Sequence, residues 1–374
     1  MTVCVGCGGQ EHQENTPPAQ EGTYDVVPTI FTDITGIPRD KTVMTVGEPE
    51  ISAELYFYWF CYVSSSLEYN ILQDYSKYGM YASCVTEGGK AVDWTGNYAG
   101  LPLIEYAKAQ TESTIKYYMA IEELAAEKGA ALTDEDKADM DSAFQSSVEE
   151  MGGQEAFIEY LQVLGISKET FDRISATSYL YDNLLEQVFT EGTDLYLPAE
   201  EYSKYGGYAD HILIATQDMK TGEQLRPEEA AKKYLLAEDL LAQIRAAEDP
   251  VKRFEELADE YSDDPGRENN PTGFIYTKGA MVPEFEGAAA ALAPGEISEI
   301  VQSDYGFHII LGRDLLAALE EDESRKADFA RAYLDEALVK KRSSSAVAYD
   351  QCLDDIDWDN FYADYIAAAD KIAG

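Results

Sequence analysis

The chain has 374 residues, of which 71 are acidic and 28 basic, so its formal charge is −43 at pH 7. A charge of this sign and size argues against a nucleic-acid ligand and against an anionic membrane surface, because both repel an acidic protein. One hydrophobic core rarely serves so many residues, and we therefore expect at least two domains.

The chain begins with a polar stretch rich in proline, glutamine and glutamate, and we predict that residues 1–40 form a disordered tether. Cys4 and Cys7 have Cys-x-x-Cys spacing, but no partner ligands lie nearby, so we expect no metal site. Val5-Gly6-Cys7 followed by Gly8-Gly9 resembles the end of a lipobox, which implies that Cys7 is a lipid acceptor. No apolar run is long enough to span a membrane.

Residues 41–200 are mainly helical in pattern. A strand over residues 43–47 precedes Ser52, whose hydroxyl suits the N-cap of a helix. Thr133 and Ser167 stand at two further N-cap positions. The helices that we expect cover residues 52–63, 103–128, 134–151, 155–164 and 168–189, and after the central segment residues 324–345 and 360–372.

Two of the three histidines lie in short apolar runs, at His211 and His308. Branched apolar residues follow His211 and surround His308, and turn formers bound both runs, so we predict two strands of one small sheet. A histidine ring in a strand needs partners for its nitrogens, and two such rings close together could satisfy each other. The alternative is a pair of hydrogen-bonded core histidines with no chemistry.

The segment between the histidines has the length of one small domain. Pro227 and Pro250 open two helices, and the turn-rich residues 262–273 follow. Further along we expect a strand at 274–276, a helix at 286–292 and a strand at 297–301.

Residues 206–314 resemble a parvulin-type peptidyl-prolyl isomerase domain. The resemblance rests on motifs in the same order: His211-Ile212-Leu213, Phe254-Glu255-Glu256-Leu257-Ala258, Tyr261-Ser262-Asp263-Asp264-Pro265-Gly266, Gly279-Ala280-Met281-Val282-Pro283-Glu284-Phe285-Glu286, Pro294-Gly295-Glu296-Ile297-Ser298 and Tyr305-Gly306-Phe307-His308-Ile309-Ile310. It implies an α+β fold with a four-stranded antiparallel sheet and surrounding helices, and isomerisation of X-Pro bonds without cofactor or metal. The chain departs from the family at Asn270-Pro271-Thr272-Gly273-Phe274, where members usually show a Gly-Gly-Asp-Leu-Gly-like stretch.

The resemblance also implies roles for single residues. His211, Asp264 and His308 would be the catalytic group, in which the histidines form a hydrogen-bonded pair and Asp264 lies near the rotating carbonyl. For Asp264, a solvated turn aspartate that caps its own backbone is an equally good reading.

Substrate binding falls to a second set of residues. Met281 and Phe285 would line the proline pocket, with Phe274 or Tyr276 as a further wall. The plainer alternative for Met281 and Phe285 is that both belong to the core. Ser303 and Asp304 precede the last strand and would help to position the ring of His308.

The layout of the whole chain resembles the PrsA-like and SurA-like extracytoplasmic foldases. That likeness implies a tether over residues 1–40, a mainly helical chaperone domain over 41–200, an inserted isomerase domain over 206–314, and C-terminal helices over 320–374 that pack on the chaperone domain. It implies an exported bacterial protein, secreted or lipid-anchored, that acts on unfolded exported polypeptides containing X-Pro bonds.

Two other functions stay open. One is a non-catalytic holdase chaperone with a degenerate parvulin domain, and the altered stretch at 270–274 motivates it. The other is an extracytoplasmic ligand-binding lipoprotein.

Overall fold

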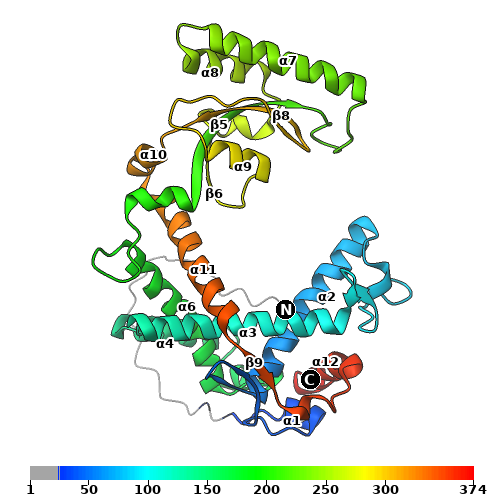
Figure 1. Cartoon of the computed structure of the whole chain (residues 1–374). Coiled ribbons are helices and arrows are strands. Elements are labelled where there is room, and N and C mark those ends of the chain that lie inside the picture. Colours follow the sequence, from blue (N-terminus) through cyan, green and yellow to red (C-terminus); the bar gives the residue numbers. More distant parts are fainter. Residues whose placement is uncertain (1–23, 25) are drawn as a thin grey trace. The chain divides into compact units, whose positions relative to one another are not determined.

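The computed structural model describes residue 24 and residues 26–374. The chain divides into two compact units. Unit 1 consists of Met1–Glu112, Lys137–Ser175 and Ala348–Gly374, and unit 2 consists of Ser113–Asp136 and Ala176–Val347. Three helices and one strand contribute residues to both units: α3 (Leu103–Lys128), α4 (Asp134–Glu150), α6 (Lys168–Phe189) and β9 (Val347–Tyr349) (Figure 1).

Unit 1 is mainly helical and has an aromatic core. Phe57 of α2 lies in its middle, with ring centroids 5.6 Å from Phe31 and 5.2 Å from Phe361. The remaining elements of the unit are α1 (Ile30–Thr35), β1 (Thr42–Val46), β2 (Glu50–Ser52), α2 (Ala53–Tyr78), η1 (Ala82–Cys84), β3 (Asn97–Tyr98), β4 (Leu101–Pro102), α5 (Gln154–Leu164), η5 (Gln351–Leu353) and α12 (Trp358–Ile372).

The predicted N-caps are confirmed. The hydroxyls of Ser52, Thr133 and Ser167 each accept a hydrogen bond from the backbone N–H three residues further on, at 3.3, 3.0 and 3.3 Å. A side-chain acceptor at this position satisfies one of the free N–H groups of the first helical turn.

Two predictions in unit 1 were wrong. The predicted tether was too long, because α1 lies within it and buries Ile30 and Phe31; residues 1–23 and 25, Cys7 among them, lie outside the described residues. The helix that begins after Ser52 does not end at Val63 but continues to Tyr78. It continues because Leu67 and Ile71 still face the core, and it ends at Gly79, which adopts the left-handed conformation that glycine accepts readily.

One buried carboxylate joins two parts of unit 1. Glu54 is 4% exposed, and its Oε1 accepts hydrogen bonds from the backbone N–H and the hydroxyl of Ser167, both at 2.7 Å. Its Oε2 accepts from Arg39 Nη1 at 2.8 Å. The start of α2 is thereby fixed to the start of α6.

Unit 2 contains a four-stranded sheet in the order β6-β5-β8-β7, and every neighbouring pair is antiparallel. This confirms the predicted α+β class and the predicted sheet. The elements of the unit are η2 (Ala199–Lys204), β5 (Gly206–Ala215), α7 (Pro227–Ala246), α8 (Pro250–Tyr261), η3 (Pro265–Glu268), β6 (Phe274–Thr277), α9 (Pro283–Ala289), β7 (Val301–Ser303), β8 (Gly306–Gly312), α10 (Leu315–Glu321), η4 (Glu323–Arg325) and α11 (Lys326–Ser344).

The two faces of this sheet bury different helices, as side-chain alternation along a strand requires. Ile212 and Ile214 of β5 pack with α7 and α8, on one side of the sheet in Figure 1. Ala209 of β5 and Ile310 of β8 pack with α9 on the other side. His211 and His308 have the strand parity of this second pair, so both rings project toward the α9 face.

Two predicted elements of this segment lie at shifted positions. The helix expected at 286–292 spans Pro283–Ala289, because Pro283 suits the first turn, where no N–H partner is lost. The strand expected at 297–301 is reduced to Val301–Ser303, with an isolated bridge between Ile297 and Leu311.

The helices that flank the sheet domain along the chain form their own core within unit 2. Leu334 and Leu338 of α11 pack with Leu124 of α3 and with Leu184 and Val188 of α6. The sequence suggested a helical domain over 41–200, an isomerase domain over 206–314 and C-terminal helices over 320–374. These borders differ from those of the two compact units, and this division stays a prediction.

Candidate active site

The antiparallel pairing of β5 with β8 brings the two histidines together. Leu213 lies opposite His308 and Ile310 lies opposite His211, so the two rings are diagonal neighbours on one face. Their Nδ1 atoms are 3.1 Å apart, and the rings are stacked at 27° with centroids 5.2 Å apart. His211 is 9% exposed and His308 3%.

Asp264 contacts His211, the more exposed of the two histidines. It follows the end of α8, and its Oδ2 lies 2.6 Å from His211 Nε2, while its Oδ1 accepts a hydrogen bond from Gly266 N at 2.9 Å. The turn cap that the sequence suggested is therefore present, and Asp264 also contacts His211; its place near a rotating carbonyl stays a prediction.

Ser303 lies at the opposite end of the pair. Its Oγ is 2.7 Å from His308 Nε2 and also accepts a hydrogen bond from Tyr305 N at 3.2 Å. Asp304 is exposed, and its described contact is a hydrogen bond from Gln224 Nε2 to its carbonyl at 3.2 Å. The structure thus brings Ser303 to the histidines as expected and leaves Asp304 outside their hydrogen-bonded chain.

With neutral rings, one proton arrangement satisfies the whole chain of contacts. The Ser303 hydroxyl donates to His308 Nε2, His308 Nδ1–H donates to His211 Nδ1, and His211 Nε2–H donates to the ionised carboxylate of Asp264. We call this series the Ser303–Asp264 chain.

The pKa of His308 is lowered to about 4, first by burial and then by the neighbouring His211, and these two effects together outweigh the opposing effect of Asp264. For Asp264, burial acts to raise the pKa, but hydrogen bonds from His211 and Gly266 N outweigh it, so the pKa of this carboxyl falls below its usual range. At pH 7 the inner ring is therefore neutral and the terminal carboxylate ionised.

Aromatic and aliphatic side chains line the same face. Phe285 of α9 is buried, and its ring centroid lies 5.2 Å from that of His211 and 6.0 Å from that of His308. Met281 packs against this cluster. The structure therefore brings Phe285 to the histidines and Met281 to the small apolar cluster that contains Phe285.

Phe274 and Tyr276 lie two residues apart on β6 and so project to the same face. Phe274 is half-buried with its ring centroid 5.7 Å from that of His211, whereas Tyr276 is buried with its ring centroid 5.9 Å from that of Phe285. Phe274 is therefore the side chain placed to form a wall beside the histidines. A groove of about 440 Å³ borders Tyr276 and Met281, and Phe285 is not among its lining residues.

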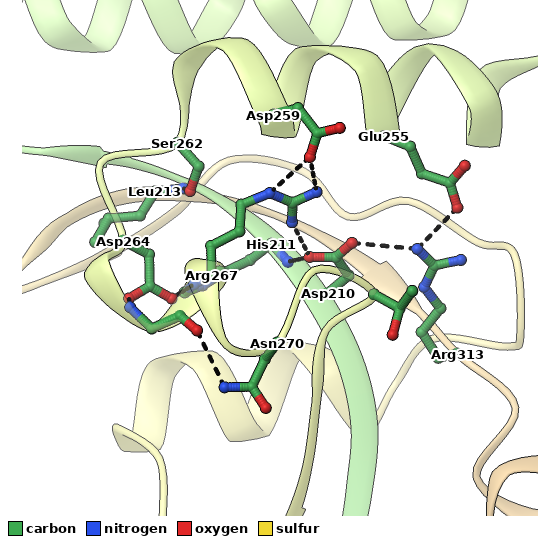
Figure 2. Close-up of polar contacts among 12 residues, drawn as sticks. Asp210, His211, Leu213, Glu255, Asp259, Ser262, Asp264, Arg267, Asn270 and Arg313 are labelled. Carbon is green, nitrogen blue, oxygen red and sulfur yellow. Dashed lines mark hydrogen bonds and ion pairs between the residues drawn. The ribbon is translucent and has the colours of Figure 1, made fainter.

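Sequence reasoning missed a set of charged residues beside His211. Figure 2 shows Asp210, Arg267 and Arg313 linked by ion pairs next to the histidine strand. The signal was present, because Asp210 is a charged residue inside an apolar strand and such residues need buried partners.

No group of three or more histidine, cysteine or acidic side chains in the described residues could hold a metal ion. None of the helices in the described part of the chain is long and apolar enough to cross a bilayer.

Comparison with known families accounts for this geometry. Residues 211–314 match the family model of the PPIC-type PPIase domain, a rotamase. The segment belongs to this parvulin-type isomerase family.

Curated relatives of the chain include foldases. The foldase protein PrsA of Halalkalibacterium halodurans is 35% identical over 173 residues, 44% of this chain and 45% of that protein. The foldase protein PrsA of Oceanobacillus iheyensis is 36% identical over 119 residues, 31% of this chain and 39% of that protein. The chain therefore spans less than half the length of each. The crystal structure of a peptidylprolyl isomerase (PrsA) from Bacillus anthracis is 23% identical, covers 61% of this chain and 96% of that chain, and aligns with a TM-score of 0.33.

Proposed function

We propose that the protein is a peptidyl-prolyl cis-trans isomerase and foldase that assists the folding of exported polypeptides. The observation that carries the proposal is the Ser303–Asp264 chain, which lies against an apolar cluster inside a parvulin-type domain. The whole-chain part of the proposal draws on the likeness to foldases over the matched residues.

The reaction requires no bond to break. Rotation about an X-Pro bond is slow because amide resonance sets a barrier of roughly 18–20 kcal/mol. An enzyme accelerates it by binding the twisted amide more tightly than the planar one. Met281, Phe285 and Phe274 would grip the prolyl ring in an apolar setting, and Tyr276 would support Phe285 from below.

The Ser303–Asp264 chain would supply the electrostatic part. A planar amide carries partial negative charge on its oxygen, and twisting reduces that charge. The ionised carboxylate of Asp264 beside this oxygen would therefore destabilise the planar form relative to the twisted one. His211 and His308 would hold the carboxylate in place without transferring a proton, and Asp304 would contact the client only from the rim.

The altered stretch before β6 is compatible with an intact sheet. Gly273 keeps φ at +103°, and a Cβ there would lie 2.5 Å from the carbonyl oxygen of Ala209. The stretch therefore retains the one glycine that lets β6 enter the sheet beside β5, although its other residues differ from the family pattern.

The partners that we propose are unfolded exported chains with X-Pro bonds, held loosely by an acidic surface that favours basic segments. We also propose export and acylation of Cys7, on the lipobox-like residues around it. Mass spectrometry of the protein isolated from its native membrane would test this, since an unmodified Cys7 contradicts the anchor.

The test of function compares isomerisation with holding. A protease-coupled assay on Xaa-Pro peptides, run with the full chain, should show faster cis-to-trans conversion, and Met281→Ala should reduce it mainly by weakening proline binding. Suppression of client aggregation without any acceleration would support the holdase alternative instead.

A further inference from the structure

The edge of β5 is left open halfway along the strand. β6 pairs with β5 only from Gly206 to Ala209. In β5 the even-numbered residues exchange backbone hydrogen bonds with β8, a pattern that continues as Thr216 N donates to Tyr305 O. The N–H groups of residues 211, 213 and 215 therefore point to the side where no strand follows, and each needs an acceptor there.

The segment after α8 takes the place of the missing strand. Leu213 N donates to Ser262 Oγ at 3.1 Å and Ala215 N to Asp263 Oδ2 at 2.9 Å, while Asp263 N donates to Leu213 O at 2.7 Å. These contacts fix the beginning of the loop that carries Asp264 to β5.

The end of the same loop is fixed by a buried ion pair. Asp210 is 0% exposed, and its Oδ1 accepts from His211 N at 2.8 Å and from Arg267 Nη1 at 2.7 Å. Its Oδ2 accepts from Arg313 Nη2 at 3.1 Å. Figure 2 shows Arg267 reaching from η3 to Asp210 beside His211.

The loop therefore contacts the histidine strand on both sides of Asp264. Asp263 precedes Asp264 and bonds Leu213, two residues after His211; Arg267 follows Asp264 and bonds Asp210, one residue before His211. Arg267 also bonds Asp259 of α8, which ties η3 back to the helix from which the loop leaves.

We propose that Asp210 and Arg267 are positioning residues for the isomerase reaction, acting as a clamp that sets the carboxylate of Asp264 against His211 Nε2. The inference rests on the proposed function and adds to it two residues that touch neither the client nor the reacting amide. A guanidinium is suited to this role, because its rigid fork can hold Asp210 and Asp259 at once.

The test substitutes Asp210→Asn in the full chain. Asparagine keeps the shape and an acceptor for His211 N but removes the charge that holds Arg267. We expect kcat for an Xaa-Pro peptide to fall by about fivefold, less than for Asp264→Asn, with KM changed less than about twofold, because the clamp acts only through the position of Asp264. The ring ¹⁵N signals of His211 should shift in the same variant, as its Nε2 loses a well-placed acceptor.

Two further variants make the test specific. Glu268→Gln removes an exposed charge next to Arg267 on η3 without altering a partner of the clamp, so kcat should stay within about twofold of wild type and the ring signals of His211 should not move. Arg267→Lys keeps the positive charge but loses the fork, and it should lower kcat less than Asp210→Asn. If Asp210→Asn does not fold, Arg267→Lys carries the test through the same two readouts.

The two readouts separate the clamp from the proposed function. A folded Asp210→Asn protein with wild-type kcat and unmoved His211 signals overturns the clamp. If the wild-type protein has no isomerase activity, the proposed function is overturned. If the His211 signals of the Asp210→Asn variant nevertheless differ from those of wild type, the clamp still stands as a structural feature.

Discussion

Two carboxylates, Glu54 in unit 1 and Asp264 in unit 2, are each held by short hydrogen bonds but have different surroundings. The partners of Glu54 are an arginine, a backbone N–H and a hydroxyl, and the residue is 4% exposed. Asp264 instead faces the ring of His211, which in turn contacts the ring of His308, and the side chain of Asp264 is 16% exposed beside an apolar cluster. A buried carboxylate whose hydrogen-bond partners are all fixed serves structure. A partly exposed carboxylate beside a titratable group is typical of a catalytic site.

The largest expected effect comes from removing the apolar support of the histidines. Phe285→Ala should lower the free energy of unfolding of the sheet domain by about 3–5 kcal/mol, because it leaves a cavity under both rings. Phe57→Ala, an equally buried phenylalanine in unit 1, should cost a similar amount in chemical denaturation. Among molecules that are still folded, only the Phe285→Ala variant should lose X-Pro turnover. An equal loss of turnover in both variants would contradict the difference that we draw between the two units.

Acid should weaken the sheet domain through His308. Its pKa is about 4 when folded against an ordinary 6.5, so protonation disfavours the folded state. The free energy of unfolding is therefore higher above pH 6.5 than at pH 4 and below. The difference is roughly 3 kcal/mol, and it is lost as the pH falls from 6.5 toward 4.

Urea unfolding between pH 7 and pH 4.5, followed by the NMR signals of the His211 and His308 rings, measures this loss; the three tryptophans all belong to unit 1 and do not report on the sheet domain. The matched variant His308→Asn should be less stable at pH 7 but should lose less stability over the same range. An identical pH dependence in the two proteins would rule out His308 as its source.

The contact of Glu54 should matter to stability alone. Glu54→Ala leaves Arg39 and the start of α6 without their acceptor and should cost about 2 kcal/mol, since Arg39 can reach water. Glu50→Ala, at an exposed position of β2 three residues before the start of α2, should cost less than about 0.5 kcal/mol. Thermal unfolding measures both, and peptide isomerisation should be unchanged in each.

The smallest effect on stability, with a clear effect on activity, is expected at Asp264. Asp264→Asn keeps the side-chain shape and should change the free energy of unfolding by less than about 1 kcal/mol, while kcat/KM falls on the order of tenfold. Glu268→Gln, at an exposed position of η3, the 3-10 helix whose N-cap is Asp264, serves as control. A wild-type kcat/KM for Asp264→Asn would assign the carboxylate to turn capping alone.

The parts of the site that lie on strands could be predicted, because apolar runs and strand alternation decide which face a residue occupies. His211 and His308 came together for this reason, whereas Phe285 lies on α9 and was expected beside them from the family resemblance. The Asp210–Arg267 pair could not be placed, since it joins residues 57 positions apart through a loop whose path no local pattern dictates. The end of α2 was missed because its continuation depends on burial of Leu67 and Ile71 by tertiary contacts.

The most direct test is exchange NMR on a peptide with one Xaa-Pro bond, in the presence of catalytic amounts of the full chain. Our account predicts cis-trans exchange many times faster than the uncatalysed process of tens of seconds, and a clear loss of that acceleration in Asp264→Asn. Exchange at the uncatalysed rate, with spectra showing the sheet domain folded and both histidine rings neutral, would contradict it.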